Sequence, residues 1–427
     1  MSERPYDTQS DVRTAAGAQA GLGMRATAAA CPDGQATHDQ GDIGAAHALE
    51  LRGLAVGHGA RALVSDIDLV VDPGEVVALI GPNGSGKTTI LHTVAGQLRP
   101  LAGSVELFGH ELASLTGTER ARTMAALFTD RPRTDLLTCQ DIVEAGRHPY
   151  TGSLGILSDE DHRRVREAME ATDTWALRDR DFAHMSDGQR QRALIARALC
   201  QEPRVLLLDE PTSYLDIRSQ VDMLQLLRAW ARERGMAVLA SLHEIDLAQK
   251  AADRIACVRD GHIMFQGTPD EVFTSDVIPV LYDLDSTSYD PFFGGVELAR
   301  PEGEPQVFVI AGGGAGATIF RALQRQGIPF AAGVLHRHDI DGLLASHLAV
   351  KSVFEDDFEP VGEDALRRAA DALRSCRAVI CPLESFGALN ARNAELLDAA
   401  RDAGIPVVRD IEQLGRVLKL GRTASND

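Results

Sequence analysis

The sequence has no long hydrophobic run. Its apolar runs, such as EVVALIG at 75–81, have the length of a strand, whereas a helix that crosses a membrane needs about 20 mostly apolar residues. The N-terminal segment also lacks a basic stretch followed by an apolar one, so we expect no secretory signal. We therefore expect a chain without a membrane span.

Clustered cysteine and an excess of basic charge are also missing. No Cys-x-x-Cys pair occurs, which argues against a zinc site or a disulfide framework and predicts reduced cysteines in a cytoplasmic protein. Lys and Arg number 43 against 62 Asp and Glu, and the net charge of -19 argues against broad nucleic-acid binding. What is present is an ordinary globular balance, 44% hydrophobic and 25% charged, over 427 residues, which suggests two or three domains.

The composition changes along the chain. Residues 1–47 hold almost no large apolar side chains and are predicted to be a disordered tail. Residues 48–275 predict a first α/β domain. Residues 276–305 are rich in Asp, Ser, Pro and Gly and predict a linker with little regular structure. Residues 306–427 predict a second, small α/β domain of Rossmann-like type, with short strands between helices.

Several runs in the first domain predict strands. EVVALIG, RVLLLDE at 204–210 and MAVLASL at 236–242 are short and apolar, as strands buried on both faces of a parallel sheet are. Residues 47–56 alternate apolar and polar side chains, as a half-buried strand does, and after a turn residues 61–71 are predicted to continue as a second strand. Further on, Asp260-Gly261 lies between two alternating segments, which is a hairpin signal.

The stretch GPNGSGKTT at 81–89 predicts a phosphate-binding loop. It has the spacing G-x-x-x-x-G-K-[ST], and it lies between a predicted strand and an apolar helix. Glycines let backbone amides turn toward phosphate oxygens, and the helix N-terminus adds its positive end. We expect Lys87 to reach the β- and γ-phosphates and the Thr88 hydroxyl to bind Mg²⁺. The predicted ATP-binding residues here are Gly81, Pro82, Asn83, Gly84, Ser85, Gly86, Lys87, Thr88 and Thr89.

Two acids end the run RVLLLDE. Asp209, at the carboxyl end of a buried strand, is expected to hold Mg²⁺ through water. Glu210 follows it directly and is predicted to orient and deprotonate an attacking water as the catalytic base. A pair of solvated acids at a strand end is the plain alternative, and the phosphate loop in the same chain favours the catalytic interpretation.

Five motifs together resemble the ATP-binding cassette family, and the match covers about 48–273. The phosphate loop and VLLLDE resemble its Walker A and Walker B motifs, and MSDGQ at 185–189 its signature. PTSYLD at 211–216 places Asp216 at the end of the family's D-loop, and His243 resembles its switch histidine, a further catalytic residue. Ser186 stands where a helix N-cap belongs, so the positive end of the following helix would point outward.

The resemblance implies a fold and an assembly. The fold is a P-loop NTPase with a mixed sheet core, an antiparallel β subdomain and a helical subdomain at about 112–202. Two copies pair head to tail, so that Ser186, Gly188 and Gln189 of one copy close over ATP and Mg²⁺ on the phosphate loop of the other. Asp216 is implied to contribute to the same ATP site.

Three positions depart from the family pattern. His58 stands where an aromatic side chain would stack on adenine, and imidazole offers less area for stacking. Thr129 or Asp130 replaces the Q-loop glutamine and would contact water or metal-bound water. Asp187 replaces the second signature residue, and its carboxylate would be unfavourable near phosphate unless it points away.

Finer features resemble one group of the family. AGRHPYTG at 145–152 is similar to a segment of cassettes that drive uptake of iron–siderophore complexes, haem or vitamin B12. This implies separate membrane permease subunits, a solute-binding protein as an indirect partner, and a peripheral position on the cytoplasmic face of the membrane. The alternative is a soluble cassette ATPase that acts on ribosomes or DNA, although the chain lacks the second cassette or the coiled-coil or zinc insertions usual there.

The second domain opens with another glycine turn. Gly312, Gly314 and Ala317 have G-x-G-x-x-A spacing between a predicted strand and a helix, as in dinucleotide-binding folds. The acid expected at the end of the next strand is replaced by His336-Arg337, and Asp339 and Asp341 follow. A dinucleotide site, as in a metabolic enzyme, and a regulatory or dimer-supporting domain that binds nothing are both open. The run EDDFE at 355–359 predicts a solvated acidic surface.

Overall fold

The computed structural model describes residues 47–128, 136–152, 155–213, 215–284 and 289–418. They form two compact units, one with residues up to 60, 66–77 and 88–241, and the other with 61–65, 78–87 and 242 onward. All but the last residue of the predicted tail at 1–47 lie outside the described residues. The domain limits predicted above stay predictions.

The strands of a four-stranded antiparallel sheet come from both sides of the phosphate loop in the sequence, two before it and two after it. Its strand order is β2-β1-β4-β5, and Leu49 of β1 lies opposite Leu107 of β4. The strands are β1 (Leu49–His58), β2 (Arg61–Val71), β4 (Ala102–Leu107) and β5 (His110–Glu111). The strands predicted at 47–56 and 61–71 are both confirmed.

A six-stranded mixed sheet has the order β10-β9-β3-β8-β7-β6. Its strands are β3 (Val76–Ile80), β6 (Met124–Leu127), β7 (Val205–Asp209), β8 (Ala237–Ser241), β9 (Arg254–Arg259) and β10 (His262–Gly267). Every residue of β3, β7 and β8 is buried, as their unbroken apolar runs predict. Asp260 and Gly261 both have positive φ between β9 and β10, which confirms the predicted hairpin.

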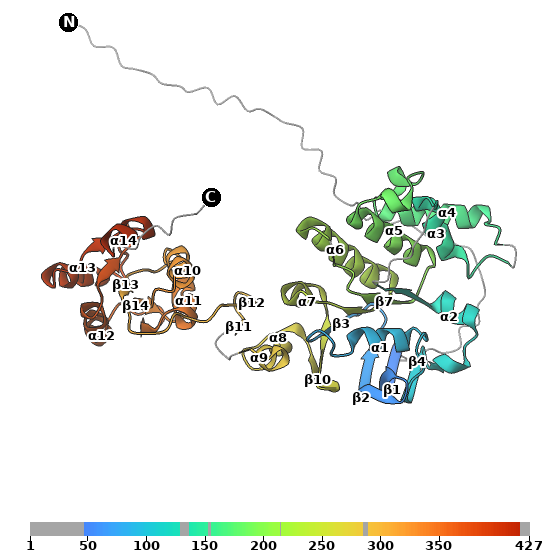
Figure 1. Ribbon diagram of the computed structural model, residues 1–427, viewed down its shortest axis with the longest axis horizontal. Helices are drawn as coiled ribbons and strands as arrows, with labels where there is room; N and C mark the ends of the chain where they lie inside the picture. Colours follow the sequence, from blue (N-terminus) through green and yellow to red (C-terminus); the bar gives the residue numbers. More distant parts are fainter. Residues whose placement is uncertain (1–46, 129–135, 153–154, 214, 285–288, 419–427) are drawn as a thin grey trace, which may run out of the picture. The chain divides into compact units, whose positions relative to one another are not determined.

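Six α-helices lie between residues 87 and 234 in the described part of the chain. They are α1 (Lys87–Val94), α2 (Gly117–Thr123), α3 (Cys139–Glu144), α4 (Asp159–Ala171), α5 (Asp187–Cys200) and α6 (Ile217–Arg234). The helices α3, α4 and α5 pack against one another and lie together in Figure 1. They fall within residues 112–202, where a helical subdomain is predicted.

Arg147, from the segment AGRHPYTG, is buried inside this helical group. Its Nε donates to Asp161 Oδ1 at 2.8 Å, and its Nη1 donates to Cys200 O at 2.7 Å and to Glu202 Oε2 at 2.8 Å. Hydrogen bonds from Ser158, with a contribution from Arg147, lower the pKa of Asp161 to about 2. Arg147 therefore connects the start of α4, through an ion pair with Asp161, to the end of α5, through its hydrogen bond to Cys200 O.

We expect Arg147→Ala to destabilise the protein by about 3–5 kcal/mol, because it leaves the buried Asp161 carboxylate without its cation. Urea unfolding of the full chain measures this loss. The matched control is Arg163→Ala on the exposed face of α4, where Arg163 pairs with Glu160 and Glu167. That change should cost less than about 1 kcal/mol. Equal losses in the two variants would contradict a structural role for Arg147.

The second unit continues beyond β8 with short elements. These are α7 (Ile245–Ala251), α8 (Pro269–Val272), α9 (Val277–Tyr282), β11 (Tyr289–Asp290) and β12 (Gly295–Val296). The expectation of little regular structure at 276–305 is wrong in part, because α9 and the hairpin β11–β12 lie there. Two buried acids anchor the hairpin: Glu297 pairs with Arg321 of the following domain, and Asp290 Oδ2 lies 3.4 Å from His347 Nε2.

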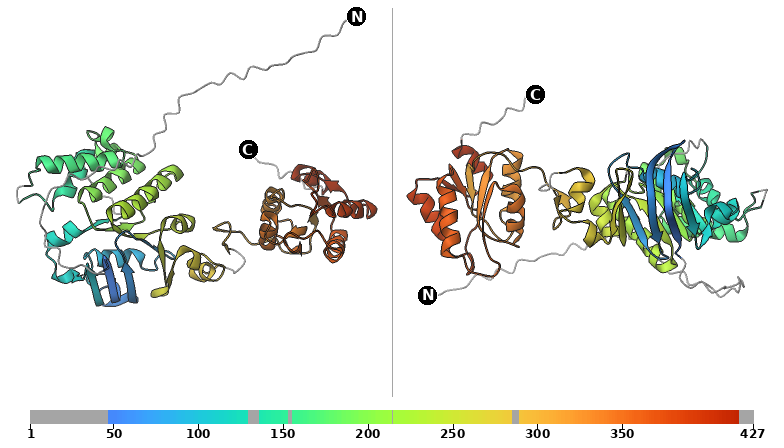
Figure 2. Two further views of the ribbon diagram at one scale, coloured as in Figure 1. Left: turned by 180° about the vertical axis from the view of Figure 1, so that it is seen from behind. Right: turned by 90° about the horizontal axis from the view of Figure 1, so that it is seen from below.

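The C-terminal region forms a five-stranded parallel sheet in the order β15-β14-β13-β16-β17. Its elements are β13 (Val307–Val309), α10 (Ala317–Arg325), β14 (Phe330–His336), α11 (Ile340–Leu348), β15 (Lys351–Glu355), α12 (Glu363–Arg374), β16 (Ala378–Ile380), α13 (Asn393–Asp402), β17 (Val407–Val408) and α14 (Ile411–Val417). Figure 2 shows helices on both faces of this sheet. The predicted small α/β domain is confirmed.

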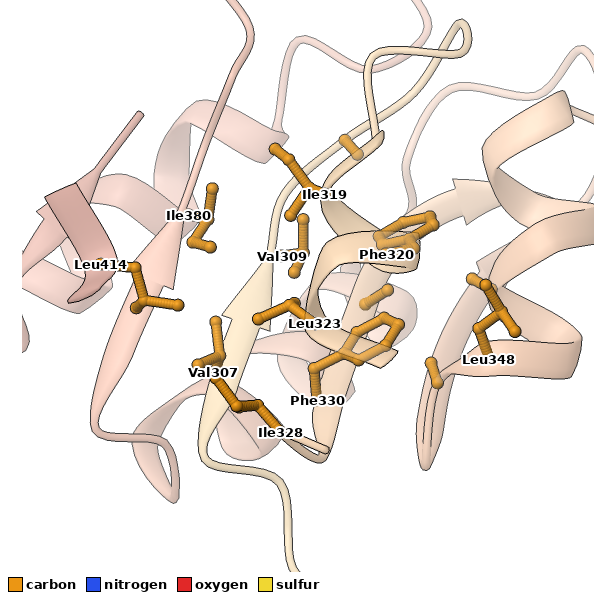
Figure 3. Packing of buried hydrophobic residues seen from close by; sticks show 14 of the residues in the cluster. Val307, Val309, Ile319, Phe320, Leu323, Ile328, Phe330, Leu348, Ile380 and Leu414 are labelled. Carbon is orange, nitrogen blue, oxygen red and sulfur yellow. The ribbon is translucent and has the colours of Figure 1, made fainter. Parts of the chain in front are cut away.

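Two apolar clusters hold these layers together. One face of the sheet packs on α10, α11 and α14, where the rings of Phe320 and Phe330 stack with centroids 5.2 Å apart (Figure 3). The other face packs on α12 and α13 around Phe308 and Val379. Alternate residues of each strand point to opposite faces, which explains why both clusters draw on the same strands.

Candidate functional site

The predicted phosphate loop is a cradle that only glycine can form. Gly81 has φ +146, and a Cβ there would lie 2.1 Å from Val258 O. Gly86 has φ +106, and a Cβ there would lie 2.4 Å from a methyl carbon of Val64. Either position therefore excludes a side chain both by space and by backbone conformation. The Ser85 Oγ atom is buried without a hydrogen-bond partner among the described residues, and a phosphate oxygen would satisfy it.

Lys87 begins α1 and folds back over the loop. Its side chain is buried, with 6% of the residue exposed, and its Nζ donates to Gly81 O at 2.7 Å and to Pro82 O at 3.0 Å. Two backbone carbonyl groups of the loop thus hold the ammonium group of Lys87 beside the loop. This position fits a lysine that neutralises phosphate oxygens.

Thr88 and Asp209 meet at the first turn of α1. The Thr88 hydroxyl donates to Asp209 Oδ1 at 3.1 Å, although 121 positions separate them in the sequence. Asp209 ends β7 and is 5% exposed. A hydroxyl and a carboxylate side by side are oxygen ligands of the kind that Mg²⁺ prefers, so these two predicted metal residues fit the ion.

Ser241, which the motifs did not single out, joins the two acids. Its Oγ donates to Asp209 Oδ1 at 2.7 Å and accepts a hydrogen bond from Glu210 N at 2.9 Å. Asp209 and Ser241 also lie opposite each other at the ends of β7 and β8. The sequence signal that could have found Ser241 is a polar residue ending the buried run MAVLASL.

Glu210 lies in a strained turn just beyond β7. Its φ is +50, an uncommon conformation for a residue with a side chain, and such strain is frequent at functional sites. The Ser213 hydroxyl donates to Glu210 Oε2 at 3.0 Å, which orients the carboxylate. An oriented carboxylate one residue after a metal-binding aspartate can accept a proton from water.

The signature segment begins α5 as a capped helix. Ser186 Oγ accepts from Gln189 N at 3.3 Å, and Gln189 Oε1 accepts from Ser186 N at 3.1 Å, which makes a capping box. Asp187, the departure from the family pattern, pairs with Arg190 Nη2 at 2.5 Å. This pairing turns its carboxylate toward a cation on its own helix.

The segment after β7 connects to two helices. Asp216 caps α6 by accepting from Ser219 N at 2.9 Å, and this bond lowers the pKa of Asp216. Gln191 of α5 donates to Pro211 O at 3.0 Å. This hydrogen bond connects α5 directly to the segment 211–216.

The other predicted residues are placed as follows. His58 is exposed at the end of β1. Gly188 lies in the first turn of α5, where an added Cβ would make an ordinary contact with Leu215 at 3.6 Å. His243 lies between β8 and α7 and is half-buried. Thr129 and Asp130 lie outside the described residues. The roles assigned to all these residues stay predictions.

Comparison with known proteins gives two family matches. Residues 64–213 match the model of the ABC transporter family, and residues 330–416 match the MJ0874 family. A solved structure of an ATP binding subunit of an ABC transporter is 28% identical, with a TM-score of 0.47 and 52% of this chain and 91% of that chain covered.

Curated relatives are more informative. An uncharacterised ABC transporter ATP-binding protein of Methanocaldococcus jannaschii is 38% identical over 70% of this chain and 100% of its own length. A ferric enterobactin transport ATP-binding protein of Escherichia coli is 36% identical over 59% of this chain and 94% of its own. A cobalamin import ATP-binding protein of Halobacterium salinarum is 33% identical over 69% and 75%. With the phosphate loop and the paired acids in place, the chain belongs to the ABC transporter ATP-binding proteins and is an ATP hydrolase.

Proposed function

We propose that this ATPase is the energy-coupling subunit of an importer for an iron chelate (a siderophore), haem or cobalamin, and that it works through separate membrane permease subunits. The observation that carries the proposal is what the similar proteins are named for: one is a ferric enterobactin transport ATP-binding protein and another a cobalamin import ATP-binding protein. In the described residues no helix is long and apolar enough to cross a membrane. We propose that the chain binds at the cytoplasmic face of the membrane as a peripheral subunit, through the permease.

The proposed active form is a head-to-tail pair of two chains. The capped N-terminus of α5 carries a partial positive charge that suits an anion. The ion pair between Asp187 and Arg190 supports this use of α5, because it offsets the negative charge that would otherwise repel phosphate. Ser186, Gly188 and Gln189 of one copy would then contact ATP held by the other, together with Asp216.

The proposed mechanism assigns one task to each residue of the site. Lys87 neutralises the β- and γ-phosphates, and the loop 81–89 orients them through its amides. Thr88 and Asp209 would hold Mg²⁺, which when bound neutralises the phosphate charge. Glu210, oriented by Ser213, accepts a proton from the attacking water. Ser241 holds Asp209 and Glu210 in place through its hydrogen bonds to both residues. His58 and His243 are proposed to contact adenine and the γ-phosphate respectively.

Co-purification tests this proposal. The tagged full chain is isolated in detergent from its native membranes, and we expect an integral membrane permease to accompany it. Chain carrying Glu210→Gln, saturated with ATP and Mg²⁺, should also form a dimer in size-exclusion chromatography with light scattering. Ser186→Arg is the matched control, since a bulky cation at the cap should prevent pairing without touching the phosphate loop.

Recovery of ribosomes or DNA in place of a permease would instead favour the alternative, a cassette ATPase that does not transport. A strictly monomeric Glu210→Gln chain in the presence of the permease would reject the head-to-tail pair.

A further inference from the structure

The C-terminal sheet leaves a cavity at the carboxyl ends of its strands. The chain runs from β13 outward to β14 and β15, and then returns to the other side of β13 as β16. At such a switch the loops diverge, and doubly wound sheets bind ligands in the resulting crevice. A cavity of about 770 Å³ lies there, lined by the segments at the ends of β13, β14, β15 and β16. This volume falls within the range of about 300–1,000 Å³ typical of small-molecule sites.

The glycine turn beside this cavity is already filled by the chain's own acids. The amides of Gly312 and Gly316 both donate to Asp341 Oδ2, at 2.8 and 2.9 Å, and the amide of Gly313 donates to Asp339 Oδ2 at 2.8 Å. In a dinucleotide site such amides would approach pyrophosphate. A phosphate here would have to displace two carboxyl groups, which argues against the dinucleotide alternative.

Asp341 cannot easily leave this position. It is fully buried, and its burial raises the pKa of the carboxyl group, although the amides of Gly316 and Gly312 act to lower it. In either protonation state its Oδ2 atom can accept the two amide hydrogens. Asp341 therefore occupies the amides of the glycine turn that would otherwise bind phosphate.

Two carboxyl groups are among the polar side chains that line the cavity, beside His336, His338 and Asn390. Asp339 and Asp357 line it from the ends of β14 and β15. The backbone amide of His338 donates to Asp357 Oδ1 at 2.9 Å, and its ring pairs with Oδ2. These bonds lower the pKa of Asp357, so its carboxylate stays ionised. Two acids at one end of the cavity favour a ligand that carries hydrogen-bond donors.

The cavity wall also has apolar side chains, which include an exposed aromatic ring. Leu335 is buried in the wall, while Leu389 is 40% and Phe358 is 89% exposed. Phe358 has φ +64, an unusual conformation for a bulky residue that is more frequent at ligand-binding segments. Its ring offers a face on which a planar group can stack.

We propose that this cavity binds a nucleoside: a planar aromatic base with amino and hydroxyl donors, and no phosphate in the glycine turn. The base would stack on Phe358 beside Leu389, and its donors would face the carboxylates of Asp339 and Asp357. This site lies entirely within residues 311–390 and is separate from the phosphate loop of the ATPase. It does not depend on the importer assignment.

Calorimetric titration of the full-length Lys87→Ala chain with adenosine, AMP and NAD⁺ tests the proposal, because that substitution weakens nucleotide binding at the phosphate loop. Adenosine and AMP differ only in the phosphate. We expect adenosine to bind one site and AMP and NAD⁺ to bind at least ~10-fold more weakly, owing to repulsion by the acids. Asp357→Asn should weaken adenosine binding by ~10-fold. Ala388→Trp, which places a bulky ring in the lining, should abolish it.

Thermal unfolding of each variant checks that the C-terminal domain is folded. The proposal is overturned if adenosine at millimolar concentration gives no binding heat, or if NAD⁺ or AMP binds as tightly as adenosine. It is also overturned if folded Asp357→Asn and Ala388→Trp chains bind adenosine like the parent chain.

Discussion

Glu210→Gln is expected to hydrolyse ATP at least ~100-fold more slowly than the unchanged chain while it still binds ATP. The amide keeps the shape of the carboxylate and can still accept the hydrogen bond that Ser213 donates to Glu210 at 3.0 Å. It cannot accept a proton from water. The change therefore removes the proposed base without disturbing the turn in which residue 210 lies.

Two measurements separate these effects. Steady-state phosphate release should fall to near background, and equilibrium titration with ATP and Mg²⁺ should give an affinity close to that of the parent chain. Glu233→Gln, at an exposed position of α6, is the matched control and should leave turnover unchanged. Normal turnover in Glu210→Gln would remove Glu210 as the base and would direct attention to another proton acceptor.

Lys87→Ala is expected to weaken ATP binding by roughly 10- to 100-fold, since a hydrogen bond to a charged group contributes about 1.5–3 kcal/mol. The Lys87 ammonium group lies at the mouth of the glycine cradle, bound to Gly81 O and Pro82 O. Removing it takes away the only Lys or Arg side chain of the predicted loop 81–89, so within this loop only the backbone amides remain to contact the phosphates.

Fluorescence titration with an ATP analogue measures this affinity. Lys250→Ala, which removes an exposed cation from α7, is the control for a general loss of charge and should have no effect. Unfolding curves show whether each variant is folded. Unchanged affinity in a folded Lys87→Ala chain would contradict the phosphate-loop assignment.

Local sequence signals were sufficient to predict much of the observed architecture. The unbroken apolar runs predicted β3, β7 and β8, because a strand buried on both faces has no need of alternation. Asp260-Gly261 predicted its hairpin because both residues tolerate positive φ. The glycines and Lys87 predicted the phosphate loop because only a few residue types allow the backbone to turn around phosphate.

Elements that depend on distant contacts were missed or misjudged. The edge strand β15 was not predicted, because only Val353 of its five residues is buried and the apolar pattern of a strand is therefore missing. Its strand conformation depends on its pairing with β14. The segment 276–305 was expected to be irregular, yet the ion pair between Glu297 and Arg321 anchors a hairpin there. Composition reports local preference and carries no information on a partner found 24 residues later.

The amino-acid sequence by itself determined the family, the phosphate loop and the identity of the paired acids, because each is encoded in contiguous residues whose chemistry is local. Tertiary structure alone decided how these groups are held: Ser241 bridges Asp209 and Glu210 from a neighbouring strand. It also decided that the glycine turn of the C-terminal domain faces Asp339 and Asp341 in place of phosphate. Both depend on hydrogen bonds between residues at least 25 positions apart, which only folding brings within reach.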